Sequence, residues 1–510
     1  MQPKSLALLC LSTLAFSATV PSHEPSALTP EERAAMRKIS ASDLRGRLSF
    51  LASDLLEGRD TPSPGLDIAA EYIASEFRRA GLEPGGNDGY FQIANFELLT
   101  PVKDGFSLRI TTPTGVTSAS PGDVAFSTTQ AIDLHHATVV KLDISTPETV
   151  AQLKPEDLRD RLVLMQAPHR GLKGLDAAFQ LVGNSQPALL VLTGAGGMRI
   201  SGNARLVDPA APRGPIDFPP MLRTMSKDFS KLYDSLPNGV TSATADLHIA
   251  APLSKLVQLK NVIGILRGSD PHLKKTCVIV TAHYDHIGTK PADDAKAGAD
   301  RIYNGANDDG SGTDSVMELA KALASLKPHP RRSIVFMTFF GEEKGELGSA
   351  YYGRHPVFPL EDTVADLNLE QVGRTDSTNG PQVNTASLTG FGYSTVSDTL
   401  VRAGRLTGIR VYKDPTASDA YFSRSDNQAL ADTGVPAHTL CVAYDYPDYH
   451  GLGDEWPKVD YNNMARVDRM VAVALLRMAN NSEAPHWNPH EPKAAQYLKA
   501  WDHVHDVSTR

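Results

Sequence analysis

Apolar, β-branched runs alternate with helical patterns along the second half of the chain. Each run is short and is bounded by turn residues, as buried strands are. The clearest runs are residues 262–266, 277–280, 333–337 and 437–443. Strands that alternate with helices favour a sheet with helices packed on its faces. We therefore expect an α/β fold for this part of the chain.

The first half of the chain shows two other patterns. Residues 39–97 are interpreted as helical, because Ile68, Ile73 and Phe77 recur at helical spacing and Gly81 ends that run. From about residue 100 to residue 251, short β-rich runs are separated by Gly, Pro and polar turns. We expect an inserted β-rich domain there, with one or two helices.

The composition narrows the classes of partner. The 510 residues are 41% hydrophobic and 21% charged, which is typical of a globular protein with two or three domains. The net charge is −9 and the isoelectric point is near 6.0. Because nucleic-acid binding needs a basic surface, we expect no nucleic-acid partner.

The N-terminus predicts export. Lys4 precedes an apolar stretch, residues 6–16, that is too short to cross a bilayer and is followed by small residues. We interpret residues 1–18 as a removable signal peptide and expect a periplasmic or secreted protein. No later stretch has the length of a membrane helix, so no stable membrane span is expected.

The cysteines limit the metal chemistry. Without the signal peptide only Cys277 and Cys441 remain, and both lie in apolar runs. Two thiols form neither a disulfide framework nor a cysteine-rich metal site. Any transition-metal ligands must therefore be histidines and carboxylates.

Polar side chains that suit such a site follow the predicted strands. Glu342 and Glu343 end the run at 333–337, and one could hold a metal while the other holds the water. His283 ends the run at 277–280, where Asp285 could orient its imidazole. Asp308 lies in a Gly- and Asp-rich turn before a helix and could bridge two cations.

Two further candidates complete this set. Glu370 ends another possible strand, and His450 follows the run at 437–443. Two histidines and three carboxylates suit two zinc ions. For His286 we expect a loop role rather than a ligand role. The chain has no His-Glu-x-x-His helix, phosphate loop or Gly-x-Ser-x-Gly elbow.

The order and context of these motifs resemble the co-catalytic dinuclear zinc aminopeptidases, whose relatives include glutamate carboxypeptidases and glutaminyl cyclases. The matching motifs are His283-Tyr284-Asp285, Gly305 to Gly312, Glu342-Glu343, Asn368-Leu369-Glu370, Ser425-Asp426-Asn427 and Tyr449-His450.

The resemblance also implies a fold and a division into domains. Residues 35–110 and 252–485 would form a zinc peptidase domain with a mixed, mostly parallel central sheet flanked by helices. Residues 111–251 resemble the protease-associated domain that many members carry as an insert. Residues 486–510 are then a polar C-terminal tail.

The resemblance implies the roles of individual residues. His283, Asp308 and Glu370 would hold one zinc ion, while Glu343, Asp308 and His450 would hold the other. Asp308 would thus bridge the two ions. Most members have Asp where Glu370 stands, but Glu is also a competent oxygen ligand.

Further roles come from the same resemblance. Glu342 matches the general base, and Asp285 matches the carboxylate that supports His283. Arg424 and Tyr449 match positions that contact the substrate or the developing oxyanion in some members, and Tyr421 is a rival for that role.

The implied activity is an exported aminopeptidase that acts on peptides with a free N-terminus. The alternatives are a carboxypeptidase, a dipeptidase or a glutaminyl cyclase on the same fold, and a non-catalytic binding ectodomain. The residue preference and the oligomeric state stay open.

Overall fold

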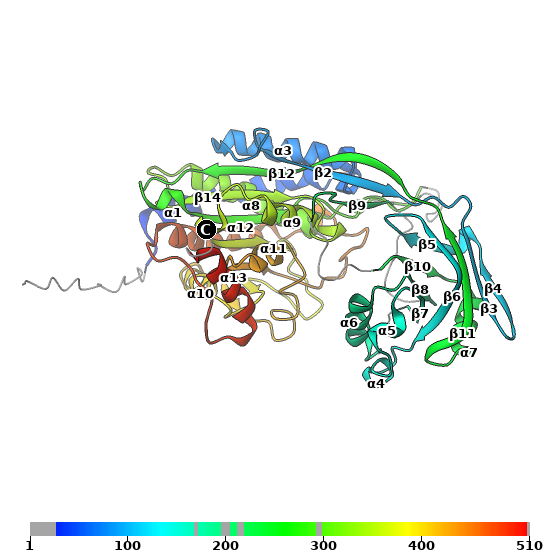
Figure 1. Cartoon of the computed structure of the whole chain (residues 1–510). Coiled ribbons are helices and arrows are strands. Elements are labelled where there is room, and N and C mark those ends of the chain that lie inside the picture. Colours follow the sequence, from blue (N-terminus) through cyan, green and yellow to red (C-terminus); the bar gives the residue numbers. More distant parts are fainter. Residues whose placement is uncertain (1–26, 168–171, 195–203, 212–218, 292–297, 507–510) are drawn as a thin grey trace, which may run out of the picture.

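The computed structural model describes residues 27–167, 172–194, 204–211, 219–291 and 298–506. Two lobes, each built on its own sheet, are joined by the long strands β2 (Phe91–Thr100) and β12 (Leu253–Leu266) (Figure 1). The predicted signal peptide, residues 1–18, lies outside the described residues.

The larger lobe contains a mixed sheet, as predicted, but the described strands form four parallel and five antiparallel pairs, so the sheet is not mostly parallel. Its central strands β14, β13, β15 and β18 are parallel neighbours, whereas β12 and β2 pair antiparallel at one side. In spatial order the strands are β17 (Arg410–Tyr412), β16 (Thr385–Leu388), β18 (Ala437–Cys441), β15 (Thr363–Leu369), β13 (Cys277–His283), β14 (Ser333–Phe339), β12, β2 and β9 (Arg205–Val207), and β1 (Glu83–Pro84) pairs with β12.

Both faces of the central strands are buried because helices cover them. Successive residues of a strand point to opposite faces. Val278 and Val280 of β13 therefore join one apolar core, whereas Cys277 and Ile279 join the other. This double burial explains why the central strands are near-continuous apolar runs in the sequence.

The helices form a layer on each face of this sheet. One core contains residues from α1 (Pro30–Lys38), α2 (Ala41–Leu51), α3 (Pro64–Ala80), α8 (Gly312–Ala324), α10 (Val396–Thr407) and α12 (Tyr461–Asn480). The other core contains residues from α9 (Leu347–Arg354), α11 (Asn427–Asp432) and α13 (Ala495–His505). The sheet is thus the middle layer of three (Figure 1).

The helical prediction for residues 39–97 holds only in part. α3 begins with Pro64 after the cap residue Ser63, and it ends before Gly81, which has a left-handed φ of 80°. The chain then forms β1 and β2 instead of continuing as helix. β2 is a strand because it pairs with β12 along its whole length.

The smaller lobe contains a second, eight-stranded sheet. In spatial order its strands are β4 (Gly115–Ala119), β3 (Ser107–Thr112), β11 (Gly239–Ile249), β6 (Ile132–Leu142), β7 (Leu162–Gln166), β8 (Leu189–Thr193), β10 (Met221–Thr224) and β5 (Val124–Ser127). Its helices are α4 (Pro147–Val150), α5 (Pro155–Leu158), α6 (Leu175–Ser185) and α7 (Lys227–Ser235). Two apolar cores made only of residues from this part of the chain lie on its faces.

The C-terminal segment is not simply a polar tail. Trp487 is buried and its indole nitrogen donates a hydrogen bond to the backbone oxygen of Gly434 at 2.6 Å. Its ring stacks on Tyr497 of α13, at a centroid distance of 5.1 Å. The aromatic residues explain the difference, because they anchor the segment against the larger lobe.

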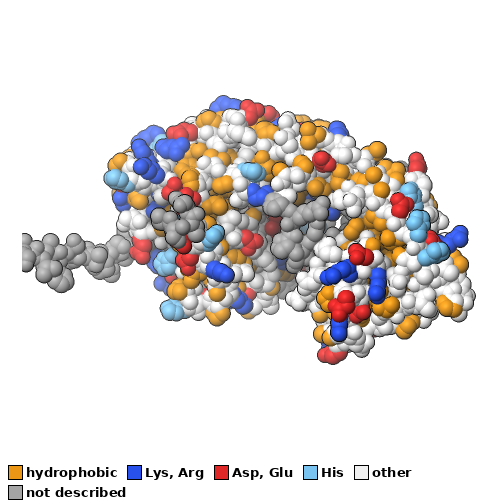
Figure 2. All heavy atoms as spheres, viewed as in Figure 1, with side chains coloured by type: hydrophobic (Ala, Val, Ile, Leu, Met, Phe, Trp, Pro, Cys, Tyr) orange, Lys and Arg blue, Asp and Glu red, His pale blue; other side chains and the backbone are white. Residues whose placement is uncertain are grey.

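The surface charge and the helix lengths concern two possible partners, nucleic acid and membrane. Lys and Arg side chains are interspersed with Asp and Glu on the face that Figure 2 shows. Among the described residues, no helix combines the length and the apolar character that a bilayer span requires.

Candidate metal centre

The candidate ligands gather at the carboxyl ends of the central strands. His283 is the last residue of β13, Glu342 and Glu343 follow the end of β14, and Glu370 follows the last residue of β15. Parallel neighbours end at the same edge of the sheet, so these side chains come together although they are far apart in sequence.

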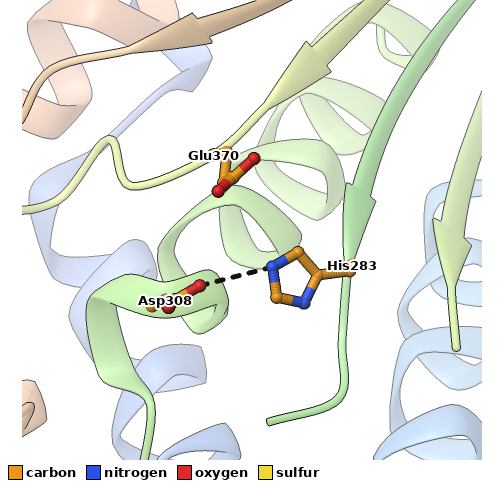
Figure 3. A group of neighbouring side chains, drawn as sticks. All are labelled: His283, Asp308 and Glu370. Atoms are coloured by element: carbon orange, nitrogen blue, oxygen red, sulfur yellow. Dashed lines mark ion pairs between the residues drawn. The ribbon is translucent and has the colours of Figure 1, made fainter. Parts of the chain in front are cut away.

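His283, Asp308 and Glu370 form the first group. His283 is fully buried, and its Nε2 lies 3.3 Å from Oδ1 of Asp308. One potential ligand atom from each of the three lies within 4.8 Å of the others. Figure 3 shows His283 on the strand, Asp308 on the segment before the helix, and Glu370 facing the space beside them.

A second group lies on the other side of Asp308. Nε2 of His450 is 3.1 Å from Oδ2 of Asp308 and 3.3 Å from Oε1 of Glu343. The two oxygens of Asp308 therefore face different histidines. A carboxylate in this position can bridge two cations, as the sequence predicts for Asp308.

His286 also lies in the second group, although the sequence analysis gave it only a loop role. Its imidazole is fully buried, and Nδ1 is 2.8 Å from Oε1 of Glu343. Potential ligand atoms of His286, Asp308 and Glu343 lie within 4.8 Å of one another. The sequence signal was the second histidine of His283-Tyr284-Asp285-His286.

The adjacent carboxyl groups of Glu342 and Glu343 have different environments. Burial raises the pKa of Glu342 well above its usual range, and Glu370 adds to this effect. Burial also disfavours the charge of Glu343, but His286 and His450 lower its pKa to about 2. Environments that push two pKa values apart suit one group to hold a proton and the other to stay ionised.

Asp285 supports His283 and Glu342. Nδ1 of His283 is 3.2 Å from the backbone oxygen of Asp285 and 3.5 Å from its carboxylate. The same carboxylate accepts hydrogen bonds from the backbone nitrogen of Glu342 at 3.1 Å and from the hydroxyl of Thr61 at 3.0 Å. These contacts leave Nε2 of His283 facing the cluster.

Two buried carboxylates that the sequence analysis did not single out brace the ligand loops. Asp309 accepts hydrogen bonds from the backbone nitrogens of His283 at 3.3 Å and Gln371 at 3.1 Å. Asp454 accepts hydrogen bonds from the backbone nitrogens of Asn307 and Asp308, both at 3.0 Å. Their only sequence signal was their place in acidic, Gly-rich loops.

Arg59 gives the turn at residues 51–61 a structural role. It is buried, and its guanidinium donates hydrogen bonds to four backbone oxygens. The acceptors belong to Leu51, Tyr284, Asn304 and Gly305. Arg59 thus ties the N-terminal helices to the two loops that carry His286 and Asp308.

A cavity of about 320 Å³ adjoins the first group. Arg424, Tyr449 and Tyr421 line it together with Glu370, so all three predicted substrate-contact positions face the same space. The guanidinium of Arg424 lies 4.7 Å from the centroid of the Tyr421 ring. Within the described part of the chain, Arg424 has no carboxylate partner.

Both groups of side chains fit zinc. A tetrahedral centre with bonds of about 2.0–2.1 Å separates its ligands by about 3.3 Å, close to the spacings of Asp308 from His283 and His450. Nε2 of His283 and Oε1 of Glu343 are buried and have no hydrogen-bond partner among the described residues. Buried polar atoms without a partner are costly unless a cation satisfies them.

The negative charge of the cluster also favours bound cations. Within the described residues, the ion pairs of Asp308, Glu342 and Glu343 are all with histidines rather than with Lys or Arg. Buried carboxylates that lack a permanent positive partner are expensive, and divalent cations offset that cost.

Relatives in sequence agree with this chemistry. Residues 261–475 match the family model described as peptidase family M28. A protein named probable zinc metalloprotease from Leptosphaeria maculans is 32% identical over 211 residues, 41% of this chain and 46% of the relative. Aminopeptidase YwaD from Bacillus subtilis is 34% identical over 116 residues, 22% of each chain. The chain thus spans less than half the length of these curated relatives.

Solved structures support the fold. The aminopeptidase from Aneurinibacillus sp. strain AM-1 superposes with a TM-score of 0.58 at 19% identity and covers 90% of this chain and 98% of its own. A zinc aminopeptidase from Bacillus subtilis gives a TM-score of 0.52 at 18% identity, over 88% of this chain and 97% of its own. At such identities the likeness concerns the fold alone. Residues 261–475, which contain all the ligand-bearing loops, are thus similar to peptidase family M28, and the relatives in sequence include a protein named a probable zinc metalloprotease.

Proposed function

We propose that this protein is an exported zinc aminopeptidase that removes N-terminal residues from peptides. The observation that carries the proposal is the convergence of His283, Asp308, Glu343, Glu370 and His450 around one edge of the sheet. The names of the aminopeptidase relatives support the choice of exopeptidase.

Two zinc ions would occupy the cluster. His283, Asp308 and Glu370 hold one, and Glu343, Asp308 and His450 hold the other. The proposal of two ions rests on Asp308, whose two oxygens face histidines on opposite sides. Two metal ions held by these residues would supply the Lewis acidity that peptide hydrolysis needs.

The protein side chains perform the proton transfers. Bound zinc supplies a Lewis acid that lowers the pKa of water to about 7 and polarises the scissile carbonyl. Glu342 accepts the proton of the attacking water at its carboxylate and returns it to the leaving amine. Burial raises the pKa of this carboxyl, which favours its protonated form. Asp285 keeps His283 and the Glu342 backbone in position.

The neighbouring cavity is the proposed site for the substrate. Arg424 offers a guanidinium without a carboxylate partner in the described chain, and Tyr449 and Tyr421 line the same cavity. We assign substrate contact to these three residues. Tyr449 stacks on the His450 ring, at a centroid distance of 4.1 Å, so it lies beside a proposed ligand.

The domain division and the export route belong to the same proposal. Residues 111–251 form an inserted protease-associated domain, which is supported by the separate sheet and cores of the smaller lobe. The peptidase domain then consists of residues 35–110 and 252–485, although β3 (Ser107–Thr112) joins the smaller sheet and β9 (Arg205–Val207) joins the larger one. The signal peptide at residues 1–18 directs the protein to the periplasm or outside the cell.

A panel of peptides tests the activity. The full chain is assayed on aminoacyl substrates and on N-blocked peptides, with and without a chelator. The proposal predicts that chelation abolishes cleavage and that only substrates with a free N-terminus are cleaved. Cleavage of blocked peptides alone would favour a carboxypeptidase, formation of pyroglutamate would favour a cyclase, and absence of zinc binding would favour a binding ectodomain.

A further inference from the structure

The imidazole of His286 is held rigidly beside the proposed second zinc position. It is fully buried, and its backbone nitrogen donates a hydrogen bond to the backbone oxygen of Arg59 at 3.2 Å. The ring packs against Gly305, where an added Cβ would come within 2.4 Å of Cγ of His286. A side chain at position 305 would displace the ring, so the glycine is required for this placement.

Among the described residues, the ring nitrogens of His286 have an ion pair with Glu343 but no hydrogen bond of ordinary geometry. In the part of the chain that the structure describes, neither Nδ1 nor Nε2 makes a hydrogen bond. Nδ1 nevertheless lies 2.8 Å from Oε1 of Glu343. Nε2 of His283 shows the same combination, with Asp308 at 3.3 Å and no hydrogen bond. In both cases a carboxylate oxygen lies close to the ring nitrogen but outside its hydrogen-bonding direction. This arrangement is expected when both atoms are ligands of the same metal ion.

His438 shows what a buried histidine without a metal does in this fold. It is also fully buried, but both of its nitrogens have partners. Nε2 lies 2.6 Å from the hydroxyl of Ser394 and Nδ1 lies 2.9 Å from the backbone oxygen of Thr389. An ordinary packing role would give His286 similar partners, because an unpaired buried polar group is costly.

We propose that His286 is a further nitrogen ligand of the second zinc ion, together with Asp308, Glu343 and His450. This inference rests on the proposed dinuclear centre and adds a residue to it. The two imidazoles approach the same oxygen of Glu343, at 2.8 Å and 3.3 Å, and their ring centroids are 5.7 Å apart. His286 comes from the rigid core, whereas His450 is 39% exposed on a loop.

The arrangement predicts how the second ion responds to mutation. His286, Asp308 and Glu343 stay in place when the exposed His450 is removed, so His450→Ala retains two zinc ions per chain and binds the second more weakly. Removing both histidines leaves only carboxylates, and the second ion is lost. Loss of a residue that only orients a ligand typically lowers the metal affinity 10–100-fold. The double variant removes two ligands, so its affinity for the second zinc ion should fall more than about 100-fold.

X-ray absorption at the zinc edge tests the inference on the native full chain without any variant. Three imidazoles shared by two ions give an average of about one and a half imidazoles per zinc. Zinc content and chelator competition are then measured for His450→Ala and for the double variant His286→Asn/His450→Ala. The controls are His438→Asn, for a buried histidine, and His248→Ala, for an exposed histidine in the smaller lobe.

The outcomes separate this inference from the proposed function. An average of one imidazole per zinc, with loss of one ion in His450→Ala, would overturn the ligand role of His286 and leave the dinuclear peptidase intact. A native chain that binds no zinc would overturn both. Retention of two ions in His450→Ala, followed by loss of one in the double variant, supports His286 as a ligand.

Discussion

The carboxylate of Asp454 accepts a hydrogen bond from the backbone nitrogen of Asp308 at 3.0 Å. The same carboxylate also accepts hydrogen bonds from the backbone nitrogen of Asn307 and from the hydroxyl of Tyr446, both at 3.0 Å. Asp454 is buried and follows His450 by four residues, so it joins the loop of one proposed ligand to the backbone of the bridging one. It would position the proposed ligands without being a ligand itself.

Asp454→Asn should weaken zinc binding by about 10–100-fold, the usual effect of losing a residue that orients a ligand. An amide has one acceptor oxygen, and its NH₂ group would face backbone donors. Chelator competition measures the change, with Asp502→Asn on the exposed face of α13 as the control. Affinity equal to that of the native chain would show that the loop holds Asp308 without Asp454.

Arg59→Met should lower the free energy of unfolding by about 3–5 kcal/mol, because it removes the guanidinium donor from four buried backbone oxygens, of which the Gly305 oxygen still accepts a hydrogen bond from the backbone nitrogen of Gly310. Urea denaturation measures the loss. The exposed Arg79 of α3 supplies the control, since Arg79→Met should stay within about 0.5 kcal/mol of the native value. Equal effects of the two variants would contradict the bracing role of Arg59.

Two glycines should respond to alanine in opposite directions. Gly46 is exposed inside α2, and an added Cβ meets nothing within 4 Å, so Gly46→Ala should stabilise the protein by about 0.5–1 kcal/mol. A Cβ on Gly312 would lie 2.1 Å from the backbone oxygen of Leu369. Gly312→Ala should therefore destabilise by about 1–3 kcal/mol. Thermal unfolding of both variants checks the pair, and a shift of the same sign would contradict it.

His438 should contribute a pH dependence to stability. Burial lowers its pKa from 6.5 to about 4, so the folded state favours the neutral ring. The contribution is complete above pH 6.5 and is lost as the pH falls from about 6.5 to about 4, with a total of about 3 kcal/mol. Unfolding free energies across this range should fall less steeply for His438→Gln. Identical slopes for the two proteins would contradict the assignment.

The sequence indicated the residues that the fold brings together because each stands beside a recognisable feature. His283, Glu343 and Glu370 follow apolar runs that become neighbouring strands, and such strands end at one edge of a sheet. The local pattern of apolar and polar residues is therefore enough to predict that these side chains lie close together.

What the sequence missed depends on contacts between distant segments. Arg59 lies more than two hundred residues from the carbonyls of Tyr284 and Asn304, and nothing near it in the chain indicates that pairing. β2 forms as a strand because β12 lies beside it. The sequence predicts a loop role for His286, because only the fold brings Glu343 to its ring.

Zinc content of the purified full chain, native and Asp308→Ala, tests the central claim most directly. We predict two ions per native chain and loss of zinc in Asp308→Ala, because this change removes the shared ligand. In a parallel sample, Glu342→Gln should keep both ions while turnover falls by about 10²- to 10⁴-fold. Two ions in Asp308→Ala, or a native chain without zinc, would contradict the account.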